Sequence, residues 1–406
     1  MDTIDKTTDI DLCLSCGICK SICPTDAIAM EFSGGQYIPK IDYESCIDCG
    51  KCLELCPGDE VDYPEIYKFK QWDYPEDVFV GNYIESYVAY SKNEEIRKSA
   101  TSGGLITNII IKLIEENRYD KAFIVDFNPS DNTEVKLKAV DKREDIIKGA
   151  KSKYLPVSVE NIINYIIKSP EDKIIVVGTS CHFQGINKFL QSEKINDDNI
   201  LFLGLFCDRT LNLNLLKYFE DNYTNRDRKI ASFYYRNKED KGWPGNLKIK
   251  TDRGQEKFID RKIRMWLKPY FTLNRCFFCI DKLNQFADIS FGDCYIPGEE
   301  SYLGKSNIII RSERGKEIFD QAKDILEYKK VEIDKIVESQ KISKRKDNLV
   351  FDKINAGKNI NQLNLKLEDF DSVKYKEELK QKQKNIDKGK DYEKNKVFIK
   401  NKIDQK

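Results

Sequence analysis

The sequence has no excess of charge of either sign, because 68 lysines and arginines balance 68 aspartates and glutamates. This balance argues against the broad basic field of a nucleic-acid binder, so we expect no nucleic-acid partner. No run approaches the roughly eighteen apolar residues that a membrane span requires. The opening residues MDTIDKTTDID lack the basic and apolar regions of a signal peptide. We therefore expect a soluble cytoplasmic protein.

Cysteine is frequent by contrast, with 13 cysteines among 406 residues. A chain of this length predicts about two or three domains. Disulfide scaffolds are usually small secreted domains, whereas cysteines spread over a large cytosolic chain more often bind metal. The spacing of the cysteines decides between these two interpretations.

Two near copies of one motif lie close to the start of the chain. They read CLSCGICKSICP from residue 13 and CIDCGKCLELCP from residue 46, and both spell C-x2-C-x2-C-x3-C-P. This is the run of bacterial ferredoxins, in which the fourth cysteine ligates the cluster of the other repeat. Two zinc knuckles are the alternative, but they do not require four cysteines and a proline in each repeat. We therefore predict two 4Fe-4S clusters, one on Cys13, Cys16, Cys19 and Cys56, and one on Cys46, Cys49, Cys52 and Cys23.

The whole chain divides into four parts. Residues 1–60 are predicted to form the ferredoxin domain, which should depend on its clusters for folding, and residues 61–85 a packed linker. From residue 86 to 345 strands alternate with helices, which predicts an α/β domain with a mostly parallel sheet. Residues 346–406 are rich in lysine and glutamate. They predict a frayed helix or a disordered tail, with a docking arm as the alternative.

Four more cysteines fall at informative places in the α/β domain. Cys181 follows the strand IIVVG and Cys207 ends the strand LFLGLF, so both lie at carboxyl ends of strands, where such sheets bind ligands. If the strands are neighbours, their thiols could share one cluster with Cys276 and Cys279, a C-x2-C pair. From the residues alone, zinc binding or ordinary buried thiols remain equally open.

Eight sequence blocks, in order, resemble one family. The blocks are IRKSATSGG (96–104), KSKYLPV (151–157), VVGTSCHFQGI (176–186), LFCDRTLN (205–212), YYRNKEDKGWPG (234–245), RCFFC (275–279), ADISFGD (287–293) and GKSNIIIRSERG (304–315). From about residue 85 to 345 the chain resembles the beta subunits of coenzyme F420-reducing hydrogenases and F420-linked dehydrogenases. Related modules occur in F420H2-dependent sulfite reductase and ferredoxin-dependent chlorophyll reductases. The resemblance implies FAD and a third 4Fe-4S cluster on Cys181, Cys207, Cys276 and Cys279.

The resemblance also implies flavin contacts, each of which has a simpler structural explanation. Ser102, Gly103 and Gly104 open a helix that suits a phosphate, or merely cap and pack it, and Lys153 alone would be a solvated surface charge. Trp243 would otherwise be a core or lid aromatic, and Asp293 part of a turn. The full set of implied FAD contacts is Ser102, Gly103, Gly104, Lys153, Tyr154, Gly178, Thr179, Arg236, Trp243, Gly292 and Asp293.

Three residues depart from the pattern of this family. Ser180 precedes Cys181 where proline is usual. His182, the only histidine of the chain, follows Cys181 where glutamine is usual. It would be a hydrogen-bonding neighbour of the cluster, or would tune its potential or pass a proton. Cys294 follows Asp293 where an aromatic or small residue is usual, and it would be a spare thiol because the other twelve cysteines fill three clusters.

Three functions are compatible with the sequence. In the first, reduced coenzyme F420 gives a hydride to FAD, and single electrons leave through three clusters to ferredoxin or a partner subunit, or flow in reverse. In the second, ferredoxin feeds the clusters and the flavin reduces another small organic molecule. In the third, the chain is an electron-transfer subunit that works only with a partner. No catalytic side chain is identified, because the hydride step demands no general base.

Overall fold

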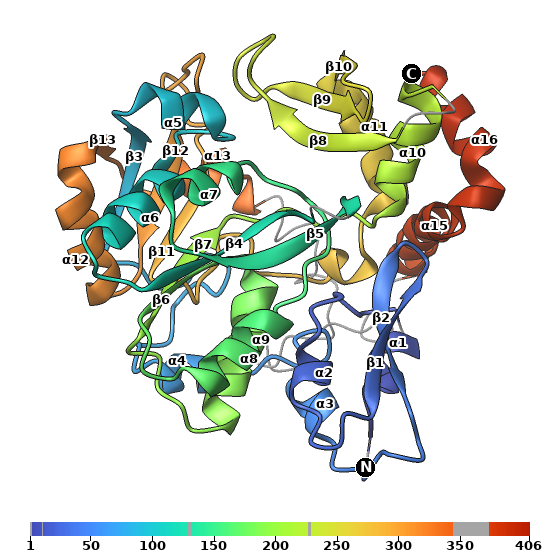
Figure 1. The fold of residues 1–406 in the computed structure, drawn as a ribbon, viewed down its shortest axis with the longest axis horizontal. Coiled ribbons are helices and arrows are strands. Elements are labelled where there is room, and N and C mark those ends of the chain that lie inside the picture. The colour runs from blue at the N-terminus through green and yellow to red at the C-terminus, as the bar shows by residue number, and fades with distance from the viewer. Residues whose placement is uncertain (1, 10, 129–130, 226–228, 344–372) are drawn as a thin grey trace.

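The computed structural model describes residues 2–9, 11–128, 131–225, 229–343 and 373–406. Its N-terminal part is a small α+β unit built around one hairpin (Figure 1). The short helices α2 and α3 each follow a glycine, Gly17 or Gly50, whose φ of 72° or 74° favours that residue type. The predicted ferredoxin-like domain is therefore confirmed. Its elements are α1 (Asp5–Asp9), α2 (Ile18–Ser21), β1 (Ile28–Ser33), β2 (Gln36–Ile41) and α3 (Lys51–Glu54).

The linker is packed against the larger domain. Helix α4 (Tyr63–Phe69) begins at the side-chain cap of Asp62, which accepts a hydrogen bond from the Glu65 amide. Tyr63 and Tyr67 are buried, and the Phe286 ring lies 5.2 Å and 5.4 Å from theirs. These aromatic contacts fix the path of the chain from the ferredoxin domain into the sheet.

An eight-stranded sheet forms the centre of the larger domain. Its order is β13-β3-β12-β11-β7-β6-β4-β5. Only the neighbouring pairs β11-β7, β7-β6 and β6-β4 are parallel, and the other four pairs are antiparallel. The expected mostly parallel sheet is thus wrong, and the sheet is mixed. The strands are β3 (Glu85–Ser91), β4 (Lys121–Asn128), β5 (Asp131–Val140), β6 (Ile174–Gly178), β7 (Ile200–Leu205), β11 (Ile289–Asp293), β12 (Ser306–Ile310) and β13 (Leu326–Lys330).

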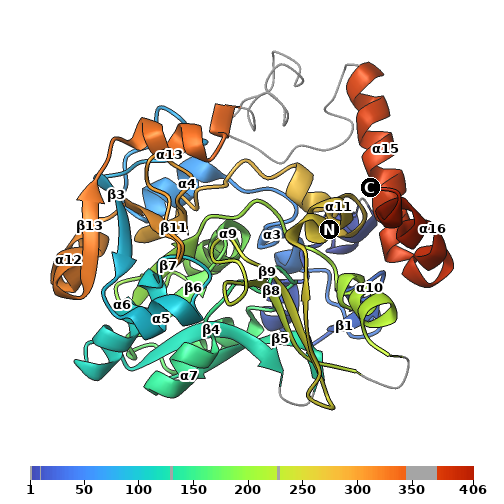
Figure 2. The same ribbon diagram turned by 90° about the horizontal axis from the view of Figure 1, so that it is seen from above.

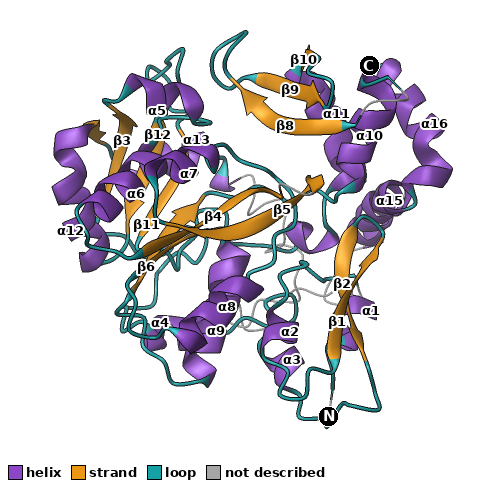
Figure 3. Ribbon diagram, in the orientation of Figure 1, coloured by secondary structure: helices purple, strands orange, loops and turns teal. Residues whose placement is uncertain are grey.

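Helices cover both faces of this sheet (Figure 3). In β6, Ile174 and Val176 join the core on one face, whereas Ile175 joins the core on the other. The first face is covered by α4, α8 (Glu160–Lys168) and α9 (Ser180–Ser192). The second face is covered by α5 (Glu94–Ser99), α6 (Leu105–Glu115), α7 (Arg143–Lys148) and α12 (Glu313–Ala322).

A second, smaller sheet was not predicted. It is antiparallel, in the order β10-β9-β8, and its strand β8 lies next to β5 at the edge of the large sheet. Its elements are β8 (Ile230–Asn237), β9 (Asn246–Thr251) and β10 (Glu256–Ile259), with α10 (Asn214–Tyr223) before it and α11 (Arg261–Phe271) after it. The short elements η1 (Asn274–Phe277), η2 (Lys323–Ile325) and α13 (Ile333–Ser339) complete this domain.

The described part of the tail, residues 373–406, is helical and docked. Helices α15 (Val373–Lys390) and α16 (Tyr392–Asp404) lie beside α10 and α11 (Figure 2). Ile386, Tyr392 and Ile399 are fully buried, so a few apolar residues on one face are enough to hold the helices. The expectation of a frayed or disordered tail is wrong for these residues, and residues 344–372 lie outside the described ranges.

Within the described ranges, none of the helices combines the length and hydrophobicity of a membrane crossing.

Candidate functional site

The thiol of Cys56 lies among the cysteines of the first repeat, although it belongs to the second. Burial and then the charge of Cys56 raise the pKa of Cys16, and burial raises that of Cys13 to about 12, with Cys56 adding to the shift. The amides of Ser15 and Gly58 donate to the sulfurs of Cys13 (3.4 Å) and Cys56 (3.3 Å). Buried thiols supplied with amide donors fit an iron-sulfur cluster, whose sulfurs accept such bonds.

The other four ferredoxin cysteines line one shared cavity. Its wall also contains Ile28, Ile41 and Gly50. The amide of Ala27 donates to the Cys23 sulfur at 3.3 Å, and Cys49 is exposed to solvent. The cysteines that line the cavity are Cys23, Cys46, Cys49 and Cys52.

The four cysteines of the larger domain come from three places in the chain. Cys181 lies in the first turn of α9, directly after β6, and Cys207 lies two residues beyond β7. Strands β6 and β7 are parallel neighbours, with Gly178 opposite Gly204, as the shared-cluster hypothesis required. Cys276 lies in η1, and Cys279 follows this element.

Electrostatic interactions show that these four thiols are neighbours. Burial raises the pKa of Cys207, and the charges of Cys276, Cys181 and Cys279 raise it further. The Thr210 amide donates to the Cys276 sulfur at 3.3 Å. In the described part of the chain, no three histidine, cysteine or acidic side chains converge on a point that fits one metal ion. Each thiolate of a 4Fe-4S cube binds a different iron, so the four thiolates stand farther apart than the ligands of one ion. The four cysteines of the larger domain therefore still fit a cube.

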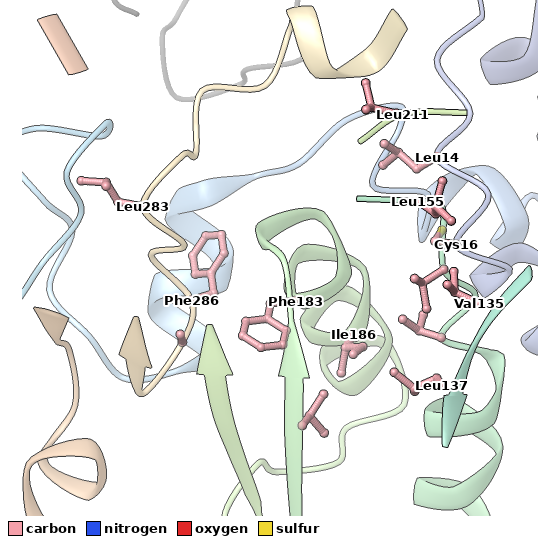
Figure 4. Packing of buried hydrophobic residues seen from close by; sticks show 14 of the residues in the cluster. Leu14, Cys16, Val135, Leu137, Leu155, Phe183, Ile186, Leu211, Leu283 and Phe286 are labelled. Atoms are coloured by element: carbon pink, nitrogen blue, oxygen red, sulfur yellow. The ribbon is translucent and has the colours of Figure 1, made fainter. Parts of the chain in front are cut away.

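The two cysteine-rich regions meet at α9. The charge of Cys181 contributes to the raised pKa of Cys16, after burial and nearer groups. The Val159 amide donates to the Cys16 carbonyl at 2.8 Å, and a Cβ on Gly185 would lie 2.1 Å from Ile18 Cδ1. Figure 4 shows Cys16 beside the loop that carries Leu155, with Ile186, in the middle of α9, nearby. Glycine in α9 therefore permits close approach of the ferredoxin domain.

Three of the predicted flavin contacts form one hydrogen-bonded group. Arg236 pairs with both carboxylate oxygens of Asp293, with an Nη2–Oδ1 distance of 3.0 Å, and is 4% exposed. Trp243 Nε1 donates to the same carboxylate at 2.9 Å, and its ring lies 5.0 Å from that of Tyr295. Against the effect of burial, the charge of Arg236 holds the pKa of Asp293 below its usual range. Asp293 is the last residue of β11, and Arg236 lies in β8. Their ion pair therefore joins the smaller sheet to the carboxyl edge of the large sheet.

The glycines before α6 serve packing. Gly104, and not Ser102, is the N-cap, with a φ of 77°. A Cβ on Gly103 would lie 2.8 Å from the Ala89 carbonyl oxygen, and the Gly103 amide already donates to Ser306 Oγ at 3.1 Å. No side chain caps the first turn of α6. An anion at this helix would therefore meet that turn rather than the Gly103 amide.

Lys153 and Tyr154 are not surface residues. Lys153 is 9% exposed, and its ammonium donates to the carbonyls of Gly149 (2.5 Å) and Ala150 (2.8 Å). The alternative of a solvated charge is thus wrong. Burial lowers the pKa of Lys153 to about 7. The Tyr154 ring lies 4.3 Å from that of Tyr235, which places an aromatic pair between the two sheets.

Gly178 and Thr179 connect β6 to the first turn of α9, and Gly292 lies in β11. Added Cβ atoms on Gly178 and Gly292 would lie 2.6 Å from the Phe183 ring and 1.9 Å from the Phe206 ring. Thr179 Oγ1 lies 3.3 Å from the Cys181 sulfur. Both glycines are therefore required by aromatic neighbours, and the hydroxyl faces the cysteine site.

Sequence reasoning did not single out Lys238. Its ammonium donates to the carbonyls of Ser102 (2.9 Å), Leu303 (2.8 Å) and Arg97. Burial, followed by the charge of Arg97, lowers the pKa of Lys238 to about 7. The residue ties the loop before α6 to the smaller sheet. Its place in the block YYRNKEDKGWPG was the available signal.

His182 and Cys294 are both turned into the protein. His182 Nδ1 lies 3.4 Å from Thr179 Oγ1, and burial lowers the pKa of His182 to about 4. A neutral ring at that position suits the predicted hydrogen-bonding neighbour of Cys181. Cys294 is 4% exposed and directly follows Asp293, and its proposed role as a spare thiol stays a prediction.

Comparison with known proteins identifies three matched regions. Residues 86–164 match the N-terminal model, and residues 171–337 the C-terminal model, of the coenzyme F420 hydrogenase/dehydrogenase beta subunit. Residues 12–59 match a 4Fe-4S dicluster domain.

Two curated relatives and one solved structure cover most of the chain. The beta subunit of coenzyme F420 hydrogenase from Methanosarcina barkeri is 26% identical over 61% of this chain and 81% of its own length. One of the subunits of the F(420)H(2) dehydrogenase of Methanosarcina mazei is 22% identical over 78% of this chain and 84% of its own length. A chain of the F420-reducing NiFe hydrogenase complex from Methanosarcina barkeri has a similar fold, with a TM-score of 0.51, 23% identity, and coverage of 67% of this chain and 93% of that chain.

The two family models adjoin one another and together span the eight-stranded sheet and the site at its carboxyl edge. The chain belongs to the family of coenzyme F420 hydrogenase/dehydrogenase beta subunits and carries a 4Fe-4S dicluster domain ahead of the family domains.

Proposed function

We propose that this chain is an iron-sulfur flavoprotein oxidoreductase that exchanges a hydride between coenzyme F420 and FAD. It passes single electrons through three 4Fe-4S clusters to ferredoxin or a partner subunit, and the flow is reversible. The relatives are by name subunits of F420 hydrogenase and F420H2 dehydrogenase, which supports both the F420 chemistry and a partner subunit. The direction of flow depends on that partner.

One observation carries the proposal: the first ferredoxin repeat packs on α9, the helix that also carries Cys181, so closely that a Cβ on Gly185 would lie 2.1 Å from Ile18 Cδ1. A cluster on Cys181 and its three neighbours would therefore lie next to the first ferredoxin cluster. The exposed Cys49 marks the second ferredoxin cluster as the place of exchange with a partner. In this order electrons would pass between the flavin and the surface by way of the cluster of the larger domain, the first ferredoxin cluster and the second ferredoxin cluster.

FAD, when bound, converts between the two electrons of a hydride and the single electrons that clusters carry. The protein binds and orients this group along the carboxyl edge of the sheet. The Arg236–Asp293 pair fixes the edge of β11, Trp243 and Tyr295 supply aromatic surface, and the first turn of α6 offers amides to a phosphate. The buried Tyr235 beside Tyr154 excludes water from the inner side.

Anaerobic stopped-flow with reduced coenzyme F420 tests the hydride step. We expect bleaching of the flavin and then of the clusters within seconds. If reduced F420 bleaches neither, while reduced ferredoxin reduces the bound flavin, the chain is instead a ferredoxin-dependent reductase of another organic substrate.

Iron analysis and EPR test the number of clusters. Fully reconstituted protein should contain about twelve iron atoms, four for each cube. Cys181→Ser and Cys279→Ser should each remove one EPR signal and leave the ferredoxin pair, and Cys294→Ser should leave all three signals. Three surviving signals in Cys181→Ser protein would contradict the third cluster.

A further inference from the structure

Arg275 lies where the ferredoxin domain meets the cysteine site of the larger domain. It directly precedes Cys276, and its side chain is buried, with the residue 6% exposed. Its guanidinium Nη2 is 3.4 Å from the carbonyl oxygen of Pro57, the residue after Cys56. One cation therefore touches the ligand loop of the first ferredoxin cluster and adjoins a ligand of the proposed third cluster.

The charge of Arg275 acts on thiols of the larger domain. It lowers the pKa values of Cys181 and Cys276, against the dominant effect of burial. A buried positive charge stabilises a neighbouring negative charge strongly, because little water is present to screen it. Adding one electron to a cluster makes the cluster one unit more negative, with no bond formed or broken.

Lys188 is a second cation near the first ferredoxin cluster, and it serves as a comparison for Arg275. This α9 residue donates to the carbonyls of Cys56 (3.2 Å) and Glu60, both in the ferredoxin domain. Burial lowers the pKa of Lys188, and the nearby Cys56 partly offsets that effect. The two cations thus share the first ferredoxin cluster, whereas only Arg275 also adjoins Cys276.

We propose that Arg275 is a positioning residue for electron transfer that raises the reduction potentials of both the first ferredoxin cluster and the cluster of the larger domain. The inference rests on the proposed function, because it requires the third cluster. A shared cation moves both potentials in the same direction and so keeps the step between the two clusters small. An arginine that merely held the two domains together would not have this effect.

EPR-monitored redox titration of the reconstituted full chain tests the proposal. In Arg275→Gln protein we expect both midpoint potentials to fall, by about a tenfold change in each reduction equilibrium, which is about 59 mV for one electron. Arg275→Lys keeps the charge and should keep both potentials. Lys188→Gln should lower only the potential of the first ferredoxin cluster. The second ferredoxin cluster serves as the internal control, and its potential should not move.

Unchanged potentials in Arg275→Gln protein would overturn the proposal, as would a shift confined to one cluster. If this variant loses the cluster of the larger domain, the first ferredoxin cluster still decides, because its ligands lie in the other domain. Its potential should then fall in Arg275→Gln but not in Arg275→Lys protein. Failure of the proposed function appears separately, as about eight iron atoms in the wild-type chain.

Discussion

At the scale of single residues, the carboxylate of Asp293 accepts from two side chains at once, the buried guanidinium of Arg236 and the indole of Trp243. We expect Asp293→Asn to destabilise the protein by about 3–5 kcal/mol, because it leaves the Arg236 charge buried without a counterion. Thermal unfolding followed by calorimetry checks this. Glu317→Gln, which breaks the surface pair with Arg118, is the control and should cost less than about 1 kcal/mol. Equal melting temperatures for the two variants would contradict the prediction.

The buried ammonium of Lys153 predicts a pH dependence. The folded pKa is lowered from 10.5 to about 7, so between these values the unfolded chain binds a proton that the folded chain does not. The free energy of unfolding should therefore rise with pH from 7 to about 10.5. Each pKa unit corresponds to about 1.4 kcal/mol, and we expect a gain of a few kcal/mol relative to Lys153→Met.

Chemical denaturation of both proteins across this range measures the difference. Lys238, whose pKa is also lowered to about 7, remains in the variant, so only the contribution of Lys153 is removed. A difference between the two proteins that does not change from pH 7 to 10.5 would show that Lys153 stays charged.

At the scale of elements, α9 supplies Cys181 in its first turn and packs against the ferredoxin domain at Gly185, in its middle. Gly185→Val should cost about 1–3 kcal/mol by overpacking, because its Cβ would overlap Ile18 and lie 3.2 Å from Pro57 Cγ. Adding Ile18→Ala should recover part of the loss, and Ser192→Val, near the other end of α9, is the control. Thermal unfolding of the wild type, the two single variants Gly185→Val and Ile18→Ala, and the double variant gives the coupling energy. Strictly additive effects would mean that Gly185 and Ile18 do not meet.

The sequence predicts some of these elements much better than others. The ferredoxin repeats, β6 and β7 follow from spacing and from apolar runs, which are local signals. The strand directions do not, because β12 and β13 return beside β3 through pairings distant in sequence. The smaller sheet alternates weakly, and the tail has few apolar residues. Tertiary contacts made by Ile386 and Tyr392, rather than helix propensity, decide its structure.

The candidate site, too, was predicted only in part. The four cysteines of the larger domain were predicted from strand ends and from the family resemblance, and the structure brings them together. Lys238 and Arg275 were missed as functional residues because a lysine or arginine is usually exposed. Only the three-dimensional contacts show that these two are buried and bonded to carbonyls of distant loops.

At the scale of the whole molecule, the chain joins two domains that are stabilised in different ways. The ferredoxin domain has a small core around Ile4, Ile28 and Ile41, whereas the sheet has large cores on both faces. We expect iron chelation to unfold the ferredoxin domain and leave the sheet folded. Hydrogen exchange measures this: β1 and β2 should lose protection while β6 and β7 keep it. Loss of protection in all four strands would contradict separate stability.

The docked tail has a consequence for synthesis. Lys390 forms an ion pair with Asp11, and Asn214 donates to the carbonyls of Gly389 and Lys390 at 2.9 Å, so α15 joins the ferredoxin domain to α10. During translation Asp11 is synthesised long before Lys390. The ferredoxin domain therefore waits through almost the whole of translation before its last contact forms.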